Sequence, residues 1–318
     1  MTRPSSLSPL AAASLVALSA AAFGTMAIFA RWAYAAGVDA YGVLMPRFVI
    51  AALLLWIILR RVGTTLPPAS RLPGLALMGL GYVAQSFCYF AALTYIPAGM
   101  VALLLYLYPL FVVLLARIVG HEPLSARKLL ALAVCSVGTV LTLGVAGAAG
   151  PATDIAFDWH GVALAVGAAC IYSVYIVGGS RATHGLDPLA STTVILSSAA
   201  VALVLIVAVR WALGLPPRLP QSGPAWSAVL AIAVVSTAIA ISLFVVGLRQ
   251  LGASRTAVIS TLEPVVTVVL AALFLQERLG FEQLIGGALV LAGALLLALH
   301  RPAEPVQEQA AASQAARR

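Results

Sequence analysis

The repeat that decides the fold consists of two stretches of 44 residues that align without a gap. Residues 95–138 read YIPAGMVALLLYLYPLFVVLLARIVGHEPLSARKLLALAVCSVG, and residues 250–293 read QLGASRTAVISTLEPVVTVVLAALFLQERLGFEQLIGGALVLAG. The identical pairs at this offset of 155 include Ala98 with Ala253, Pro109 with Pro264, Glu122 with Glu277 and Gly138 with Gly293. Self-similarity over such a length predicts two homologous halves.

A second, weaker match lies earlier in each half. The stretch AGVDAYGVLMPRFVIAALLL (36–55) aligns with HGLDPLASTTVILSSAAVAL (184–203) at an offset of 148, which pairs Gly37 with Gly185 and Asp39 with Asp187. The difference between the two offsets falls in the proline-rich segment after residue 212, where an insertion is tolerated.

Composition places the chain in a membrane. Hydrophobic residues make up 62% of the 318 residues, charged residues make up 9%, and the mean hydropathy is +1.06. A helical crossing of a bilayer needs about 20 apolar residues. Ten predominantly apolar runs have this length: 10–30, 42–60, 74–94, 98–118, 127–147, 160–179, 189–212, 224–247, 253–275 and 282–300. The sequence therefore predicts an all-α integral membrane protein with ten transmembrane helices.

The basic residues indicate orientation rather than nucleic-acid binding. With the N-terminus in the cytoplasm, thirteen of the eighteen lysines and arginines fall in cytoplasmic segments, four fall on the opposite side, and Arg47 lies within a run. Cytoplasmic loops of membrane proteins carry such an excess. We therefore expect both termini in the cytoplasm and no nucleic-acid partner. For the first run, a span is favoured over a cleaved signal peptide because the repeat includes it.

Five spans in each half have a topological consequence. An odd number of crossings turns the second half upside down, which produces the inverted repeats found in secondary transporters. The expected segments are a cytoplasmic N-terminal segment (1–9), a first repeat (10–147), an extracytoplasmic linker (148–159), a second repeat (160–300) and a disordered cytoplasmic tail (301–318). In such architectures the substrate binds near the midplane and the halves rock to alternate access.

These motifs resemble the EamA repeats of the drug/metabolite transporter superfamily. The resemblance covers roughly residues 10–300 and is most specific at LYPLFVVLLARIVGHEPLSARKLLALAVCSVG and LEPVVTVVLAALFLQERLGFEQLIGGALVLAG. Both stretches carry a proline, an apolar run, a glutamate and a glycine-bearing span, and LMPRFVIAALLL resembles the second-span signature. The resemblance implies a ten-helix basket with a central cavity in the bacterial inner membrane, similar to the aromatic amino-acid exporters.

A carboxylate and a proline interrupt the ninth run. Glu263 lies about ten residues into this run, roughly 15 Å deep, and shares a helix face with Thr256 and Ser260. A carboxylate at this depth normally faces a cavity or a partner. Because desolvation disfavours its charged form, Glu263 is a candidate for proton coupling, and a structural carboxylate that bridges helices is the alternative. Pro264 and its counterpart Pro109 are expected mainly to bend their helices.

The third run has a polar, aromatic face, because Tyr82, Gln85, Ser86 and Tyr89 stand at i, i+3, i+4 and i+7. Tyrosine rings with polar tips suit a small amphiphile that has an apolar side chain and a charged end. The expected lining of the substrate cavity comprises Tyr82, Gln85, Ser86, Tyr89, Tyr106, Tyr108, Tyr172, Tyr175, Ser260 and Glu263. For any single tyrosine, a packed ring with its hydroxyl on a neighbouring carbonyl is the alternative.

Arg47 is the other charge within an apolar run. It lies about five residues from the outer end of the second run, where snorkelling to the outer surface is the plainer interpretation. The alternative is an anchor for an anionic group, either a substrate carboxylate or an acidic side chain.

Residues for several other chemistries are missing from the sequence. Lys128 is the one lysine, and PLSARK is no phosphate-binding loop, so ATP-driven transport within this chain is not expected. The histidines stand at span ends without an HExxH motif or metal-ligand spacing, and no GxSxG elbow occurs. We therefore expect no metal, no cofactor and no enzymatic activity.

The sequence as a whole predicts a secondary transporter that exports a small metabolite by alternating access. The expected substrate is an amino acid with an aromatic or bulky apolar side chain, and nucleotide sugars or drugs are the alternatives. A membrane-embedded protein without transport activity is the rival class. The expected partners are the substrate and the lipid bilayer, and a monomer is compatible with the sequence.

Overall fold

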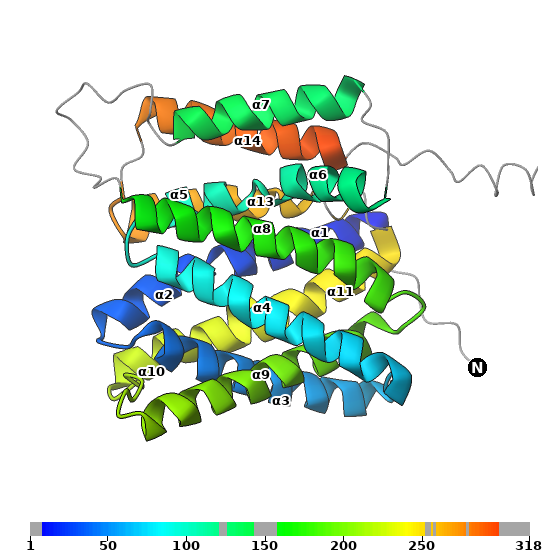
Figure 1. Cartoon of the computed structure of the whole chain (residues 1–318), viewed down its shortest axis with the longest axis vertical. Helices are drawn as coiled ribbons and strands as arrows, with labels where there is room; N and C mark the ends of the chain where they lie inside the picture. The colour runs from blue at the N-terminus through cyan, green and yellow to red at the C-terminus, as the bar shows by residue number, and fades with distance from the viewer. Residues whose placement is uncertain are drawn as a thin grey trace, which may run out of the picture.

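Every regular element is a helix within the residues that the computed structural model describes, which are 8–120, 126–142, 158–251, 256, 259–277 and 280–298. The elements are α1 (Pro9–Gly24), α2 (Met26–Ala35), α3 (Ala40–Val62), η1 (Ala69–Arg71), α4 (Leu72–Ala92), α5 (Ala98–Leu105), α6 (Tyr108–Gly120), α7 (Ala126–Thr142), α8 (Trp159–Ala182), α9 (Pro188–Ala212), α10 (Gly223–Ala233), η3 (Val234–Ile239), α11 (Ala240–Leu251), α13 (Leu262–Phe274) and α14 (Phe281–Ala298). The helices cross the molecule in roughly one common direction (Figure 1).

Seven of the ten predicted spans coincide with helices that are long and apolar enough to cross a membrane. These are Pro9–Ala35, Ala40–Val62, Ala69–Ala92, Ala98–Leu115, Trp159–Gly179, Pro188–Ala212 and Gly223–Gly247. The other three predicted spans contain shorter apolar helices over Leu129–Leu141, Leu262–Phe274 and Phe281–Leu296. The all-helical membrane fold agrees with the sequence, and ten crossings stay a prediction.

Two equivalent turns explain the weaker repeat match. Gly37 follows α2 and Gly185 follows α8, and their φ angles of 85° and 75° are ones that glycine adopts without a steric penalty. Asp39 and Asp187 then cap α3 and α9. Each carboxylate accepts a hydrogen bond from the backbone N–H three residues later, at 2.7 Å and 3.0 Å. The shared glycine therefore ends one helix, and the shared aspartate begins the next.

The packing of the helices agrees with two halves that are related by a two-fold axis. In this relation, the counterpart of α7 is α14, that of α3 is α9, that of α1 and α2 is α8, that of α4 is the segment from α10 to α11, and that of α5 and α6 is α13. Two pairs of counterparts, α7 with α14 and α3 with α9, pack directly against each other. The two pairs lie at opposite edges of the bundle (Figure 1). The pairing of α4 with α8 is matched by that of α11 with α1, and the pairing of α6 with α8 by that of α13 with α1. Matched contacts of this kind are the ones that a two-fold axis between the two halves produces.

The crossing of α7 and α14 shows the relation at single atoms. A Cβ added to Gly138 would lie 2.7 Å from the Gly286 carbonyl oxygen, and a Cβ added to Gly293 would lie 3.0 Å from the Ala131 carbonyl oxygen. Ala131 and Gly286 are counterparts at the offset of 155, as are the two glycines. Small residues at such a crossing let membrane helices approach closely.

This close approach can be tested with two alanine substitutions. We expect Gly293→Ala to destabilise the protein by about 1–3 kcal/mol, because the added methyl group overpacks the crossing. Gly167→Ala on α8 is the matched control, since an added Cβ there meets nothing within 4 Å, and better helix propensity predicts a neutral or slightly stabilising effect. Thermal unfolding in detergent measures both variants. Equal shifts of the apparent Tm would contradict the close crossing.

Candidate functional site

Two helices are interrupted at equivalent positions, one in each half. Tyr106 and Leu107 form a turn between α5 and α6, and Thr261 forms a turn before α13. Pro109 is the second residue of α6, and Pro264 is the third residue of α13. A proline lacks the N–H that would bond to the carbonyl four residues earlier, and its ring clashes with that carbonyl. Both prolines therefore lie just after an interruption of the helix, and the bend expected at each stays a prediction.

A tyrosine of the first half fills the gap that the second proline leaves. In a continuous helix, the residue at the position of Pro264 would donate to the Ser260 carbonyl. The Tyr106 hydroxyl donates to this carbonyl at 2.6 Å, and its oxygen lies 3.2 Å from Oε2 of Glu263. Tyr106 is buried and Glu263 is half-buried. One hydroxyl group thus joins the broken backbone and the carboxylate.

Five tyrosines form a continuous series of ring contacts, which we call the aromatic path. The ring centroids are 5.7 Å apart for Tyr106 and Tyr108, 4.8 Å for Tyr108 and Tyr172, 5.9 Å for Tyr172 and Tyr175, and 5.9 Å for Tyr175 and Tyr82. These separations are typical of favourable aromatic pairs. All of the rings except that of Tyr106 are half-buried. The path connects α4, α8, α6 and the turn after α5.

Arg47 lies at the other end of the aromatic path. Its side chain is 1% exposed, so it does not snorkel to the surface. Nε donates to Thr237 Oγ1 at 3.0 Å and Nη2 donates to the Tyr82 hydroxyl at 3.1 Å. Cζ lies 4.8 Å from the Phe48 ring centroid and 5.3 Å from that of Phe90. In the described part of the chain, no carboxylate forms an ion pair with this guanidinium.

A π-helix presents Thr237 to the guanidinium, and sequence reasoning identified neither the π-helix nor this residue. The segment Val234–Ile239 is π-helical, a local widening that often occurs at functional sites. The Thr237 hydroxyl donates to the Ile232 carbonyl at 2.9 Å, and its oxygen therefore accepts from the guanidinium. Next to it, Ser236 Oγ lies 2.8 Å from Thr25 Oγ1 in the turn between α1 and α2. The sequence signal is a polar pair within an otherwise apolar run.

Glu263 contacts the same turn through its backbone. Thr267 Oγ1 lies 3.0 Å from the Gly24 carbonyl oxygen and 3.1 Å from that of Glu263. A Cβ at Gly24 would lie 2.9 Å from the Glu263 carbonyl oxygen, so glycine permits α1 to approach α13 this closely. Arg47 and Glu263 are thus connected twice, through the aromatic path and through polar residues of η3, the α1–α2 turn and α13.

Three residues of the expected lining lie beside the aromatic path. Gln85 and Ser86 are buried, with the Ser86 hydroxyl 3.4 Å from Oε1 of Gln85. Tyr89 is buried, and its ring contacts that of Phe90 at 5.8 Å. Among the described residues, no hydrogen bond or ring contact joins these three to the path. The same residues contain no group of three or more His, Cys, Asp or Glu side chains that could hold a metal ion.

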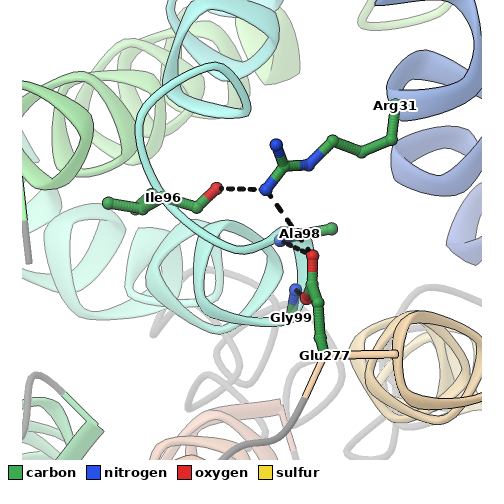
Figure 2. A network of polar contacts seen from close by, with 5 residues as sticks. All are labelled: Arg31, Ile96, Ala98, Gly99 and Glu277. Atoms are coloured by element: carbon green, nitrogen blue, oxygen red, sulfur yellow. Dashed lines mark hydrogen bonds and ion pairs between the residues drawn. The ribbon is translucent and has the colours of Figure 1, made fainter. Parts of the chain in front are cut away.

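At one end of the bundle, Glu277 caps a helix of the other half (Figure 2). Its two carboxylate oxygens accept hydrogen bonds from the backbone N–H groups of Ala98 at 2.8 Å and Gly99 at 3.1 Å. These are the first amides of α5, and the residue before them, Pro97, provides no side-chain cap. A carboxylate at a helix N-terminus satisfies free N–H groups and complements the helix dipole.

Arg31 of α2 completes this cluster. Its Nη2 lies 3.7 Å from Oε1 of Glu277 and donates to the Ile96 carbonyl at 3.2 Å (Figure 2). The cluster therefore joins α2, the start of α5 and the segment after α13. Glu122, the repeat counterpart of Glu277, lies outside the described residues.

The bond between Tyr106 and the Ser260 carbonyl can be tested by removing one oxygen atom. Tyr106→Phe leaves this carbonyl without its donor, which should cost about 1–3 kcal/mol. The matched control is Tyr175→Phe, because within the described residues Tyr175 contributes ring contacts and no hydrogen bond. We expect a lower apparent Tm in detergent for Tyr106→Phe alone. If the two variants unfold at the same temperature, the carbonyl is satisfied in another way.

Comparisons with known proteins agree with this architecture. The uncharacterized transporter YcbK of Bacillus subtilis (strain 168) is 28% identical over 83% of this chain and 85% of its own. The threonine/homoserine exporter RhtA of Escherichia coli (strain K12) is 28% identical over 80% of this chain and 81% of its own. A solved crystal structure aligns with 90% of this chain and 96% of its own at a TM-score of 0.61 and 22% identity, which supports the fold alone. The EamA-like transporter family model matches residues 10–144 and 159–299, and the chain is therefore a multi-pass membrane protein that belongs to this family.

Proposed function

We propose that the protein is a secondary transporter that exports amino acids across the bacterial inner membrane by alternating access. The observation that carries this proposal is the aromatic path between two intramembrane groups of opposite charge, Arg47 and Glu263. An amino acid has the matching chemistry, because it carries a carboxylate, an ammonium group and a side chain that can pack on aromatic rings. A membrane protein without transport activity has no need of such a polar interior.

Two classes of amino acid have separate support. The tyrosine rings favour an aromatic or bulky apolar side chain. The threonine/homoserine exporters among the relatives favour a short polar side chain, although these relatives are only 28% identical to this chain. Nucleotide sugars and drugs are the alternative substrates, and a transport panel separates all of these classes.

The interrupted helices supply the positions at which the halves can move. Half-helices that meet at a break near the midplane are common at the substrate sites of secondary transporters. Here the breaks at Tyr106 and Thr261 flank the carboxylate of Glu263. At the bundle end that the charge bias assigns to the outside, Glu277 holds α5 and α2 together. Access from that end requires this cluster to separate.

We assign proton coupling to Glu263 on the basis of its hydrogen-bond partners. Tyr106 has one O–H, and the nearer acceptor is the Ser260 carbonyl at 2.6 Å. The lone pairs of the Tyr106 oxygen, 3.2 Å from Glu263, then match a protonated carboxyl group, which donates, better than a carboxylate, which only accepts. In the described part of the chain, no basic side chain pairs with Glu263. Its negative charge is therefore neutralised by a bound proton or by the ammonium group of the substrate.

Counterflow in proteoliposomes tests the proposed function. The panel consists of the common amino acids, UDP-glucose and GDP-mannose, with protein-free liposomes as the control. We expect at least one amino acid to exchange and neither nucleotide sugar to do so. Exchange of the nucleotide sugars alone, or of no compound that the panel contains, would refute amino-acid transport.

The coupling role is tested with Glu263→Gln, which keeps the shape of the side chain but cannot ionise. We expect an imposed pH gradient to drive wild-type transport and to lose its effect on this variant, while exchange of substrate for substrate continues. Glu282→Gln is the matched control, because Glu282 is an exposed carboxylate in the first turn of α14. A normal response of Glu263→Gln to the gradient, or no response of the wild type, would make transport facilitative and Glu263 structural.

A further inference from the structure

We propose that Arg47 binds the carboxylate of the substrate and that Tyr82 and Thr237 hold its guanidinium ready for this purpose. The inference rests on the proposed function and adds which end of the amino acid is recognised, and by which residue. It also excludes amines that lack a carboxylate from the preferred substrates.

In the described part of the chain, no acidic side chain balances the charge of Arg47. The side chain is 1% exposed and lies among the rings of Phe48, Tyr82 and Phe90. Within the described residues, no carboxylate pairs with it. Rings attract a cation over their faces, but a buried charge is normally paired with an opposite charge. An anionic ligand would supply this missing charge.

Part of the Arg47 guanidinium remains available for a ligand. Nε donates to Thr237 and one N–H of Nη2 donates to Tyr82. Nη1 makes no hydrogen bond in the described structure. The fully buried side-chain nitrogens and oxygens without a hydrogen-bond partner there are the Nε atoms of Arg31 and Arg210, so Nη1 is not fully enclosed. Nη1 and Nη2 together form an edge that matches a carboxylate in bidentate geometry.

Thr237 and Tyr82, which accept the hydrogen bonds of Arg47, are themselves held in place. Thr237 gives its hydrogen to the Ile232 carbonyl, so its oxygen is fixed as an acceptor for Nε. The Tyr82 ring meets the Phe48 ring edge-on at 5.1 Å. Because the Tyr82 oxygen accepts from Arg47, its own O–H is free to donate to the same carboxylate. A guanidinium fixed in this way loses little freedom when the ligand binds.

Arg47 has no basic counterpart in the second half. At the offset of 148, the counterpart of Arg47 is Ile195, which is buried in α9. The two-fold scaffold therefore forms in the second half without an arginine at this position. A helix-packing role does not explain why one half carries a buried cation, whereas a ligand with one carboxylate requires one anchor.

The experiment compares each amino acid with its decarboxylated amine. Binding to the protein in lipid nanodiscs is measured by titration calorimetry for L-phenylalanine and phenethylamine, and for L-threonine and 1-amino-2-propanol. We expect the wild type to bind one of the amino acids at least about tenfold more tightly than its amine. Arg47→Gln and Arg47→Lys should weaken binding of that amino acid by about tenfold or more and leave binding of the amine nearly unchanged.

The matched control is Arg210→Gln. Arg210 also stacks on a tyrosine, with its Cζ 4.2 Å from the Tyr41 ring centroid, but it lies outside the aromatic path. This variant should keep the wild-type preference. Equal wild-type binding of amino acid and amine overturns the anchor even if both Arg47 variants fail to fold, and an unchanged preference in folded Arg47 variants overturns it as well. If amino acids exchange in counterflow, such a result leaves the proposed function intact, whereas the absence of amino-acid binding and exchange overturns both.

Discussion

The hydrogen bond from Tyr106 to the Ser260 carbonyl is the interaction on which the interior of this protein depends. An unpaired buried backbone group costs about 1–3 kcal/mol, and the core of a bilayer has no water to replace the lost partner. Pro264 creates such a group, and Tyr106 of the other half satisfies it at 2.6 Å. The same hydroxyl group lies beside Glu263, and its ring begins the aromatic path. The helix break, the carboxylate and the contact between the halves therefore share one side chain.

The two halves provide a common scaffold, but they carry different chemistry. The equivalent turns at Gly37 and Gly185 and the crossing at Gly138 and Gly293 are backbone features, and they occur in both halves. The two charged groups at the ends of the aromatic path, in contrast, each occur in one half only. Arg47 has Ile195 as its counterpart, and Glu263 has Tyr108. Symmetric packing thus surrounds an asymmetric interior, which suits a substrate whose two ends differ.

Local sequence signals predicted the elements well, because they report on properties of one helix at a time. Apolar length predicted seven helices that are long and apolar enough to cross a membrane, and the aligned glycines and aspartates marked the turns in which Gly37 and Asp39 act. The depth of Glu263 and the polar face with Tyr82 were also visible within single runs. The repeat alignment identified Pro109 and Pro264 as equivalent before any contact between them and the other half was known.

Contacts between helices could not be predicted in the same way. Periodicity gives the face of a helix but not the helix that it meets, so the order of the five rings and the exclusion of Gln85 and Ser86 from the path depend on crossing geometry. Snorkelling was the plainer expectation for Arg47, because the sequence shows its distance from the end of the span. The sequence does not show that the rings of Phe48 and Phe90 pack over its side chain. A proline is compatible with a bend or a break, and tertiary contacts decide between them.

We infer that the substrate binds along the aromatic path between Arg47 and Glu263. A cryo-EM structure of the protein in lipid nanodiscs, with an amino acid that exchanges in counterflow, tests it most directly. We expect ligand density with its carboxylate at the Nη1–Nη2 edge of Arg47 and its side chain against the tyrosine rings. Ligand density elsewhere in the bundle, with the Arg47 edge and the rings left uncontacted, would contradict it.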